Sequence, residues 1–227
     1  MDRNYRYLTV LFDLDGTLAD TASDLGFALN LQLQERGRAT VPDELIRPHA
    51  SSGARGLLRL GFNLEVDAPE FQAMRSEFLD LYAENLARTT TLFPGVAELL
   101  DGIEARGLSW GIVTNKPERF TFPLLEALNL HQRAACVVCG DTTARPKPDP
   151  APLLHACALL NQPPGACIYI GDDERDVVAA IAAGMDSVVA LYGYLGEDSD
   201  PRSWGANASI EDPRDLLAFL DGHEARI

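Results

Sequence analysis

The chain has 227 residues and a formal net charge of −15 at pH 7, from 34 acidic and 19 basic side chains. This length allows one α/β domain with a smaller insertion and a substantial hydrophobic core. Nucleic acids bind proteins mainly through Lys and Arg contacts to phosphates, so the acidic balance excludes nucleic acid as the expected partner. No apolar run approaches the roughly 18 residues that span a membrane. We therefore expect a cytoplasmic protein with no membrane partner.

The first predicted element is a strand at residues 7–12, an apolar run rich in side chains that favour β-structure. Asp13, Asp15 and Gly16 follow it directly. Because the two acids are two residues apart, an extended backbone directs both carboxylates to the same side. Such carboxylates repel each other unless a divalent cation separates their roles, one as ligand or nucleophile and the other as proton carrier. A turn capped by Asp before Gly is the alternative interpretation.

Residues 18–88 show the three- and four-residue spacing of apolar side chains that is typical of helices, and no convincing strand. Asp20 or Thr21 can cap the first helix. The expected helices cover residues 21–36, 42–48, 54–60 and 71–86, with a turn at residues 51–53. We therefore expect an all-helical insertion at residues 18–88, between a first core segment at residues 1–17 and a second at residues 89–227.

Helices and strands alternate in the second segment. Helices are expected at residues 96–105, 118–128, 150–160, 174–183 and 213–220, and strands at residues 108–114, 135–140, 166–171, 187–191 and 207–210. Strands that are separated by single helices form a parallel sheet with right-handed crossovers. The predicted fold class is therefore α/β, with a parallel sheet flanked by helices.

Two later segments place polar groups where phosphate could bind. Thr114 and Asn115 end a strand and offer a hydroxyl and backbone N–H groups, although a strand that ends in Thr-Asn usually just starts a helix. Lys147 lies between Pro146 and Pro148, which stiffen the loop and hold one ammonium group in place. An exposed lysine in a proline-rich connector is the alternative.

The segment after the strand at residues 166–171 is strongly acidic. Asp172, Asp173, Glu174 and Asp176 are four acids within five residues. Acids at a helix N-terminus interact favourably with the helix dipole, which can account for one or two of them. A hard cation with oxygen ligands, such as Mg²⁺, would offset the repulsion among all four.

The cysteines indicate a reduced protein. Cys136 and Cys139 have the spacing of a zinc knuckle but lack a second such pair or a paired histidine nearby. We expect these two, with Cys157 and Cys167, to be reduced thiols of the core.

These segments, taken in order, resemble the four motifs of the haloacid dehalogenase-like (HAD) hydrolases, and the resemblance covers nearly the whole chain. The motif residues are Asp13-Leu-Asp15-Gly-Thr-Leu, Thr114-Asn115, Lys147, and Gly171-Asp172-Asp173 with Asp176. The resemblance implies a Rossmann-like parallel sheet core with a small all-helical cap domain inserted after the first strand. Phe93-Pro-Gly95, Thr114-Asn-Lys-Pro117 and Lys147-Pro-Asp-Pro150 are similar to the phosphoglycolate phosphatase branch in particular.

The family resemblance implies a phosphoric monoester hydrolase with Mg²⁺ as cofactor. Asp13 would be the nucleophile that forms an aspartyl phosphate, and Asp15 would protonate the leaving oxygen and later activate water. Asp13, the backbone carbonyl of Asp15, and Asp172 would bind Mg²⁺, with Asp173 or Asp176 supporting these ligands. Its partner would be a small phosphorylated substrate, and the sequence does not predict an oligomeric state.

The same resemblance assigns the phosphate-binding groups. Thr114 and the backbone of Asn115 would hold phosphoryl oxygens, and Lys147 would balance the charge between nucleophile and phosphate. Mg²⁺ and Lys147 would together make the local charge positive, so a strongly acidic protein could still bind a phosphate ester.

Substrate choice is expected to depend on the cap loop at residues 47–55. Arg47, Ser52 and Arg55 are candidate substrate-binding residues, because an arginine can bind a substrate carboxylate through two hydrogen bonds. Ordinary surface arginines are the alternative. The expected substrate is 2-phosphoglycolate, which carries such a carboxylate.

Other activities remain open at this point. Residues 171–176, 193–195 and 200–206 also resemble the N-acetylmuramic acid 6-phosphate phosphatases, and Ser51-Ser52-Gly53 stands where phosphoglycolate enzymes more often have Gly-Asn-Gly. A phosphosugar mutase would share every core motif and differ in the cap. A haloalkanoate dehalogenase is disfavoured by Asp15 and Asp172, and a binding module without catalysis by the complete set of motif residues.

Overall fold

A computed structural model describes residues 5–196 and 200–222 of the chain. Its central sheet has the strand order β5-β4-β1-β6-β7-β8, and all of these pairings are parallel. The strands are β1 (Thr9–Phe12), β4 (Ser109–Val113), β5 (Val137–Val138), β6 (Cys167–Gly171), β7 (Asp186–Ala190) and β8 (Ala208–Ile210). The predicted α/β fold with a parallel, Rossmann-like sheet is confirmed.

Strand β1 lies inside the sheet, between β4 and β6. Its side chains alternate between the two faces: Val10 and Phe12 belong to one hydrophobic cluster and Leu11 to another. All three are fully buried. A strand covered on both faces needs apolar residues at every position, which explains the uninterrupted apolar run before Asp13.

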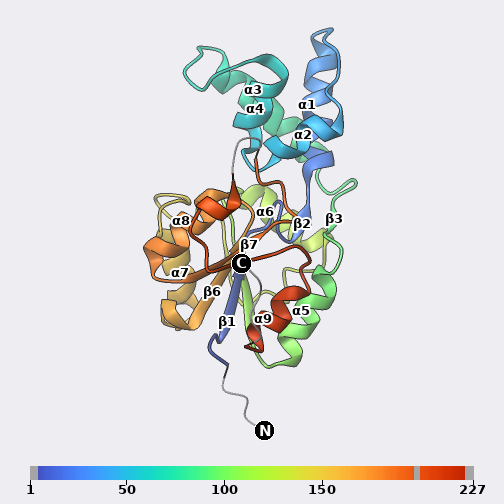
Figure 1. The fold of residues 1–227 in the computed structure, drawn as a ribbon. Coiled ribbons are helices and arrows are strands. Elements are labelled where there is room, and N and C mark those ends of the chain that lie inside the picture. The colour runs from blue at the N-terminus through green and yellow to red at the C-terminus, as the bar shows by residue number, and fades with distance from the viewer. Residues whose placement is uncertain (1–4, 197–199, 223–227) are drawn as a thin grey trace.

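Helices cover both faces of the sheet, with α7 and α8 on one side and α5 and α9 on the other (Figure 1). The core helices are α5 (Val96–Ala105), α6 (Glu118–Ala127), α7 (Ala151–Leu160), α8 (Glu174–Ala183) and α9 (Asp215–Leu220). Their bounds agree with the expected helices to within two residues. All four cysteines are free and buried, as expected of core thiols.

The inserted helices pack together beyond one end of the sheet, above it in Figure 1, and we call them the cap. The cap consists of α1 (Ala22–Glu35), α2 (Asp43–Ala50), α3 (Gly53–Phe62) and α4 (Phe71–Glu84). Leu29, Ile46 and Phe78 are fully buried in it. The predicted domain boundaries at residues 17/18 and 88/89 stay a prediction.

A short two-stranded ribbon lies where the chain enters and leaves the cap. Strands β2 (Ala19–Asp20) and β3 (Thr91–Leu92) pair antiparallel. From the sequence we expected no strand in residues 18–88, so the prediction was wrong for β2. A strand of two residues is too short to show any periodicity in side-chain polarity.

Asp24 fixes the segment that enters the cap to the segment that leaves it. Its buried carboxylate accepts hydrogen bonds from the backbone N–H and the hydroxyl groups of both Thr89 and Thr90, at 2.6–3.2 Å. Burial alone would raise the pKa of Asp24, but these hydrogen bonds outweigh it and lower the pKa. The first turn of α1 is thereby tied to the segment that returns to the core.

Some local expectations were wrong in detail. The strand expected at residues 135–140 is reduced to β5, and Thr21 makes no side-chain cap for α1. The Thr21 hydroxyl donates instead to Asp15 Oδ1, at 2.6 Å.

Among the described residues, no helix has both the length and the apolar composition of a transmembrane segment.

Candidate active site

The carboxyl ends of three adjacent strands bring the predicted motif residues together. Asp13 follows β1, Thr114 follows β4 and Asp172 follows β6, while Lys147 lies in the loop before α7. In open α/β sheets, ligands bind beyond these strand ends. Here a cavity of about 270 Å³ opens there, lined by core residues below and by cap residues above.

Lys147 is buried at the base of this cavity, with 2% of its side chain exposed, so it is not the exposed lysine of the alternative interpretation. Its Nζ lies 3.0 Å from Asp13 Oδ1 and donates to Asp176 Oδ1 and to the Tyr169 hydroxyl, both at 2.7 Å. Burial would lower the pKa of Lys147, but the charges of Asp13 and Asp176 outweigh it and raise the pKa. The ammonium group therefore remains charged beside the predicted nucleophile.

A cluster of three carboxyl groups, two of them buried, lies at this ammonium group. Oxygen atoms of Asp13, Asp172 and Asp176 lie within 4.8 Å of one another. Burial and the charges of Asp13 and Asp176 raise the pKa of Asp172 well above its ordinary value. If all three carboxyl groups were ionised, the cluster would hold more negative charge than Lys147 alone can balance.

Gly16 packs so closely against the side chain of Asp172 that no larger residue fits at this position. A Cβ atom added at Gly16 would lie 2.1 Å from Asp172 Oδ2, and Gly16 has a φ of +85°. Both the space and the conformation therefore require glycine at this position. The close approach explains why a glycine follows the two acids of the first motif.

The donor set of the cluster suits a hard divalent cation. It consists of carboxylate oxygens only, as Mg²⁺ prefers, and its excess negative charge would be offset by such an ion. The side chain of Asp176 belongs to this group together with Asp13 and Asp172. Asp173 lies beside it as the N-cap of α8, where it forms a capping box with Asp176.

Asp15 is held apart from the carboxylate cluster. Its Oδ1 accepts from the Thr21 hydroxyl at 2.6 Å and from Lys116 Nζ at 2.9 Å. Lys116 also donates to the hydroxyl of Tyr82 on α4, at 2.9 Å. These contacts fix the orientation of the Asp15 side chain and link it to the cap.

Lys116 was not predicted as a site residue. The sequence contains two lysines, Lys116 and Lys147, and both are buried at this site. Buried lysines are rare unless they are paired. Lysine occurs at only two positions of the sequence, and each lies in a motif or directly after one. This pattern was the signal that could have identified Lys116.

Thr114 and Asn115 lie on the cavity wall, as expected. The Thr114 hydroxyl accepts from the backbone N–H of Lys116 at 3.1 Å. The Asn115 side chain exchanges two hydrogen bonds of 2.9 Å with the backbone N–H and C=O of Lys147. This amide therefore fixes the Lys147 loop against the end of β4, a role that the sequence did not indicate.

The cap loop rests directly on the core site. The Ser51 hydroxyl donates to Asp172 Oδ2 at 3.1 Å, and its backbone carbonyl accepts from Arg175 at 2.7 Å. Arg175 is itself held by Asp173 through two hydrogen bonds of 2.7 Å. Ser52 and Arg55 line the cavity next to this contact.

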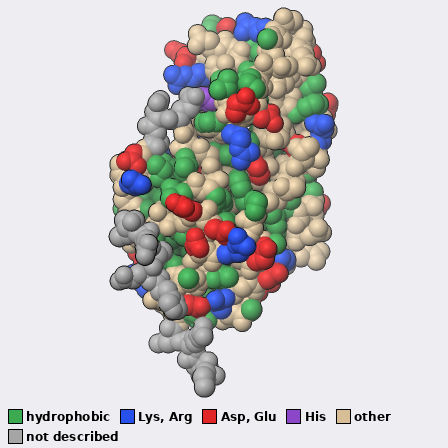
Figure 2. All heavy atoms as spheres, turned by 45° about the vertical axis from the view of Figure 1, so that its right-hand side comes forward, with side chains coloured by type: hydrophobic (Ala, Val, Ile, Leu, Met, Phe, Trp, Pro, Cys, Tyr) green, Lys and Arg blue, Asp and Glu red, His purple; other side chains and the backbone are tan. Residues whose placement is uncertain are grey.

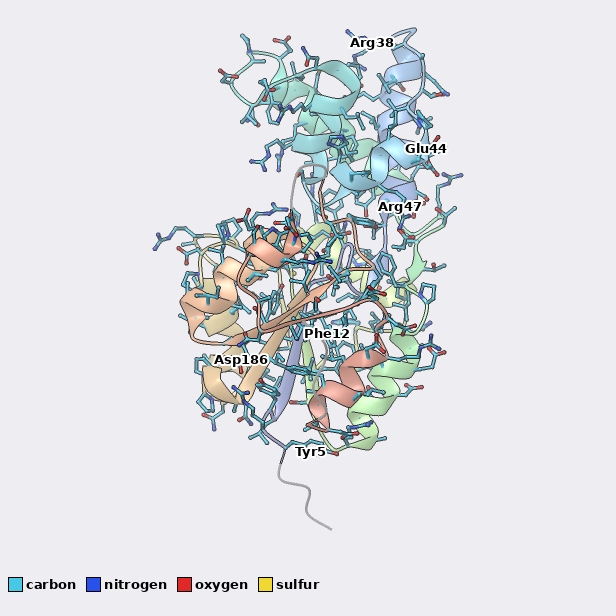
Figure 3. The ribbon with its side chains drawn as sticks, in the orientation of Figure 1. Tyr5, Phe12, Arg38, Glu44, Arg47 and Asp186 are labelled. Carbon is cyan, nitrogen blue, oxygen red and sulfur yellow. The ribbon has the colours of Figure 1, made fainter. Side chains whose placement is uncertain are left out.

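Arg47 lies elsewhere. Its guanidinium group is 3.0 Å from both carboxylate oxygens of Asp20 and 5.4 Å from the centre of the Tyr194 ring, and it does not line the cavity. Figure 3 shows it at the junction between cap and core. The structure thus brings Ser52 and Arg55 to the site, and instead of Arg47 it adds Arg75 and Phe78 of α4.

Comparison with known proteins agrees with this arrangement. A family model described as haloacid dehalogenase-like hydrolase matches residues 10–190, which include every motif residue named above. The chain belongs to this family.

Two curated relatives of this HAD chain are phosphatases. An N-acetylmuramic acid 6-phosphate phosphatase from Pseudomonas putida is 42% identical over 216 residues, which are 95% of this chain and 97% of the relative. A phosphoglycolate phosphatase from Xanthomonas campestris pv. campestris is 45% identical over 207 residues, 91% of this chain and 93% of the relative. The comparisons confirm the predicted enzyme class, a HAD-type phosphatase.

A solved structure supports the fold of this HAD phosphatase. The crystal structure of a predicted phosphoglycolate phosphatase from Haemophilus somnus aligns with a TM-score of 0.81 and 26% identity, and covers 94% of this chain and 98% of the other. On the face in Figure 2, basic and acidic side chains are interspersed and form no continuous basic surface.

Proposed function

We propose that this chain is a Mg²⁺-dependent phosphatase that hydrolyses a small phosphate monoester through an aspartyl phosphate on Asp13. The observation that carries the proposal is the buried ammonium group of Lys147, 3.0 Å from Asp13 Oδ1 at the base of the cavity. A nucleophile paired with a fixed cation can accept a phosphoryl group whose negative charges the cation stabilises.

The first step transfers the phosphoryl group. A carboxylate oxygen of Asp13 attacks phosphorus, the bond from phosphorus to the ester oxygen breaks, and Asp15 gives its proton to that leaving oxygen. Thr114 and the backbone of Asn115 hold the transferring oxygens, and Lys147 balances their charge. The hydrogen bonds from Thr21 and Lys116 keep the Asp15 carboxyl group directed into the cavity.

The second step releases phosphate. Asp15, now a carboxylate, takes a proton from a water molecule that attacks phosphorus, and the bond to Asp13 breaks. The free carboxylate of Asp13 and the proton on Asp15 are thereby restored. Hydrolysis of such esters needs accelerations of up to ~10²¹-fold, which requires exact positioning and positive charge together.

The carboxylate cluster would hold the cofactor. Asp13, Asp172 and the backbone carbonyl of Asp15 would bind Mg²⁺, with Asp173 and Asp176 supporting them. When bound, Mg²⁺ would supply positive charge beside the phosphoryl oxygens. Together with Lys147 it would make the local charge favourable for a phosphate in a chain with a net charge of −15.

Mg²⁺ is expected to stabilise the folded protein. An ion that binds only the folded state adds about 2.7 kcal/mol to the free energy of unfolding at 100 times its Kd. Thermal unfolding of metal-free protein should therefore shift upward on titration with MgCl₂. The Asp172→Asn variant should lose the shift, whereas Asp43→Asn, an exposed acid on α2, should keep it. Equal shifts in all three proteins would contradict a site at this cluster.

The first candidate substrate is 2-phosphoglycolate. The phosphoglycolate phosphatase of Xanthomonas campestris is 45% identical, and Arg55 and Ser52 line the cavity where a substrate carboxylate could bind. The second candidate is N-acetylmuramic acid 6-phosphate, the substrate in the name of the Pseudomonas putida relative. Leu79 of α4, an apolar side chain that lines the cavity and is only half-buried, favours it, because a two-carbon acid with its phosphate beside Lys147 would leave this side chain uncovered.

Phosphate release from both compounds, with Mg²⁺ and with EDTA, tests the proposal. We expect Mg²⁺-dependent release from at least one of them, with a difference in kcat/KM that identifies the substrate. ³¹P NMR of the products separates hydrolysis from isomerisation by a phosphosugar mutase. Activity that EDTA leaves unchanged, or a sugar phosphate isomer as the product, would contradict the proposal.

A further inference from the structure

One face of helix α4 forms part of the cavity wall. Arg75, Phe78, Leu79 and Tyr82 all line the cavity, and they occupy positions i, i+3, i+4 and i+7 of the helix. Tyr82 is at the inner end, where its hydroxyl contacts Lys116 of the core. Arg75 therefore lies about 10 Å further along the helix axis, beyond the apolar side chains.

The guanidinium group of Arg75 has no carboxylate partner among the described residues. The neighbours three and four positions away on α4 are Phe71, Gln72, Phe78 and Leu79, none of which is acidic. Several other arginines in this acidic chain are paired with carboxylates, as Arg36 is with Glu77 and Arg106 with Asp221. An unpaired arginine on a cavity wall is a ready binding group for an anion.

Arg55 of α3 shows the same pattern. It lines the cavity, and it forms no ion pair within residues 5–196 and 200–222. At i+4 it faces Arg59, a like charge that costs stability in a helix, and Arg59 pairs with Glu65, at 3.2 Å. The cap thus presents two unpaired positive charges to a cavity whose base is lined by carboxylates.

We propose that Arg75, with Arg55, binds a second anionic group of the substrate, a carboxylate separated from the phosphate by an uncharged portion. The proposal rests on the phosphatase function above and names the specificity site of the same cavity. The phosphate would bind beside Lys147, the middle of the substrate would contact the half-buried Leu79, and the carboxylate would reach Arg75. Its position beyond the apolar wall favours an extended, sugar-sized acid over a two-carbon acid.

Two matched pairs of substrates isolate the effect of the carboxylate. N-Acetylmuramic acid 6-phosphate and N-acetylglucosamine 6-phosphate differ only in the lactyl ether that carries the carboxylate. Similarly, 2-phosphoglycolate and 2-hydroxyethyl phosphate compare a short acid with a short neutral alcohol. The kcat and KM of each compound are measured with wild type, Arg75→Ala, Arg75→Lys, and Arg59→Ala, an exposed arginine of the cap that does not line the cavity.

For Arg75→Ala, we expect kcat/KM for N-acetylmuramic acid 6-phosphate to fall by roughly 10- to 100-fold, mainly through KM, as for loss of a charged hydrogen bond. N-Acetylglucosamine 6-phosphate should change by less than about twofold, Arg75→Lys should recover part of the loss, and Arg59→Ala should match wild type. Equal losses on charged and neutral substrates, or no loss on either acid, would overturn the proposal. A loss confined to 2-phosphoglycolate would overturn the extended-substrate part of it.

Failure of the underlying function would appear differently. If wild type releases phosphate from none of the four compounds, the phosphatase assignment for these substrates fails. The binding role of Arg75 is then decided by calorimetry with N-acetylmuramic acid 6-phosphate. A Kd that is at least tenfold weaker for Arg75→Ala than for Arg59→Ala supports the binding role. This difference corresponds to a loss of roughly 1.4 kcal/mol or more of binding free energy. Equal affinities, or no binding to wild type, overturn it.

Discussion

The Asp13→Asn variant is expected to fold and to release phosphate at least ~10³-fold more slowly than wild type, as seen when other enzymes lose a nucleophile. The amide oxygen of asparagine is too weak a nucleophile to accept the phosphoryl group. Folding should be retained because the substitution removes one charge from a buried cluster of carboxylates. Phosphate release with saturating Mg²⁺ and thermal unfolding measure the two effects.

Asp43→Asn is the control for this experiment, since it also removes one negative charge but lies on the exposed side of α2. It should keep wild-type activity. Asp13→Asn protein that is folded and retains more than about a tenth of the wild-type rate would rule out Asp13 as the nucleophile.

The Lys147→Met variant is expected to lose both activity and stability. Removing one partner of a buried ion pair typically costs about 3–5 kcal/mol, because the other charges remain buried without compensation. Here Asp13 and Asp176 would both lose their ammonium partner. Loss of a group that stabilises the transition state should in addition lower kcat by about 10²–10³-fold. Denaturant unfolding and phosphate release measure these losses separately.

A double variant separates the two effects of Lys147. Lys147→Met combined with Asp176→Asn removes both partners of the 2.7 Å ion pair, so it should recover part of the stability but none of the activity. Arg145→Met is the matched control from the same loop, since Arg145 is exposed and pairs with Asp149. If Lys147→Met is as stable and active as Arg145→Met, the buried ion pairs do not have the role given to them here.

The central part of the site was predictable because its residues follow strands. Asp13, Thr114 and Asp172 each come directly after a segment that must be a buried strand, and in a parallel sheet such positions meet at one edge. Their convergence follows from local sequence and the rules of connection alone. The burial of Lys147 was not predictable in this way, since a proline-flanked loop gives no information about depth. Its burial depends on Asp13, Tyr169 and Asp176, which lie far away in the sequence.

The cap side of the site was harder to predict for a physical reason. Helical spacing identified α1 to α4, but which face of each helix meets the core depends on how the helices pack against one another. Arg47 and Arg55 are the two ends of the expected loop at residues 47–55, yet Arg47 pairs with Asp20 and only Arg55 lines the cavity. Arg75 is distant in sequence from that loop and reaches the same cavity from α4.

A rapid-quench experiment on Asp15→Asn with 4-nitrophenyl phosphate tests the central claim, covalent transfer to Asp13, most directly. Nitrophenolate leaves without a proton donor, so the first step should proceed, while the second step should stall for lack of a base to activate water. We predict a burst of about one nitrophenolate per enzyme molecule, and an intact mass increased by one phosphoryl group that peptide mapping assigns to Asp13. A burst-free time course with unmodified enzyme, or a phosphoryl group on another residue, would contradict the account.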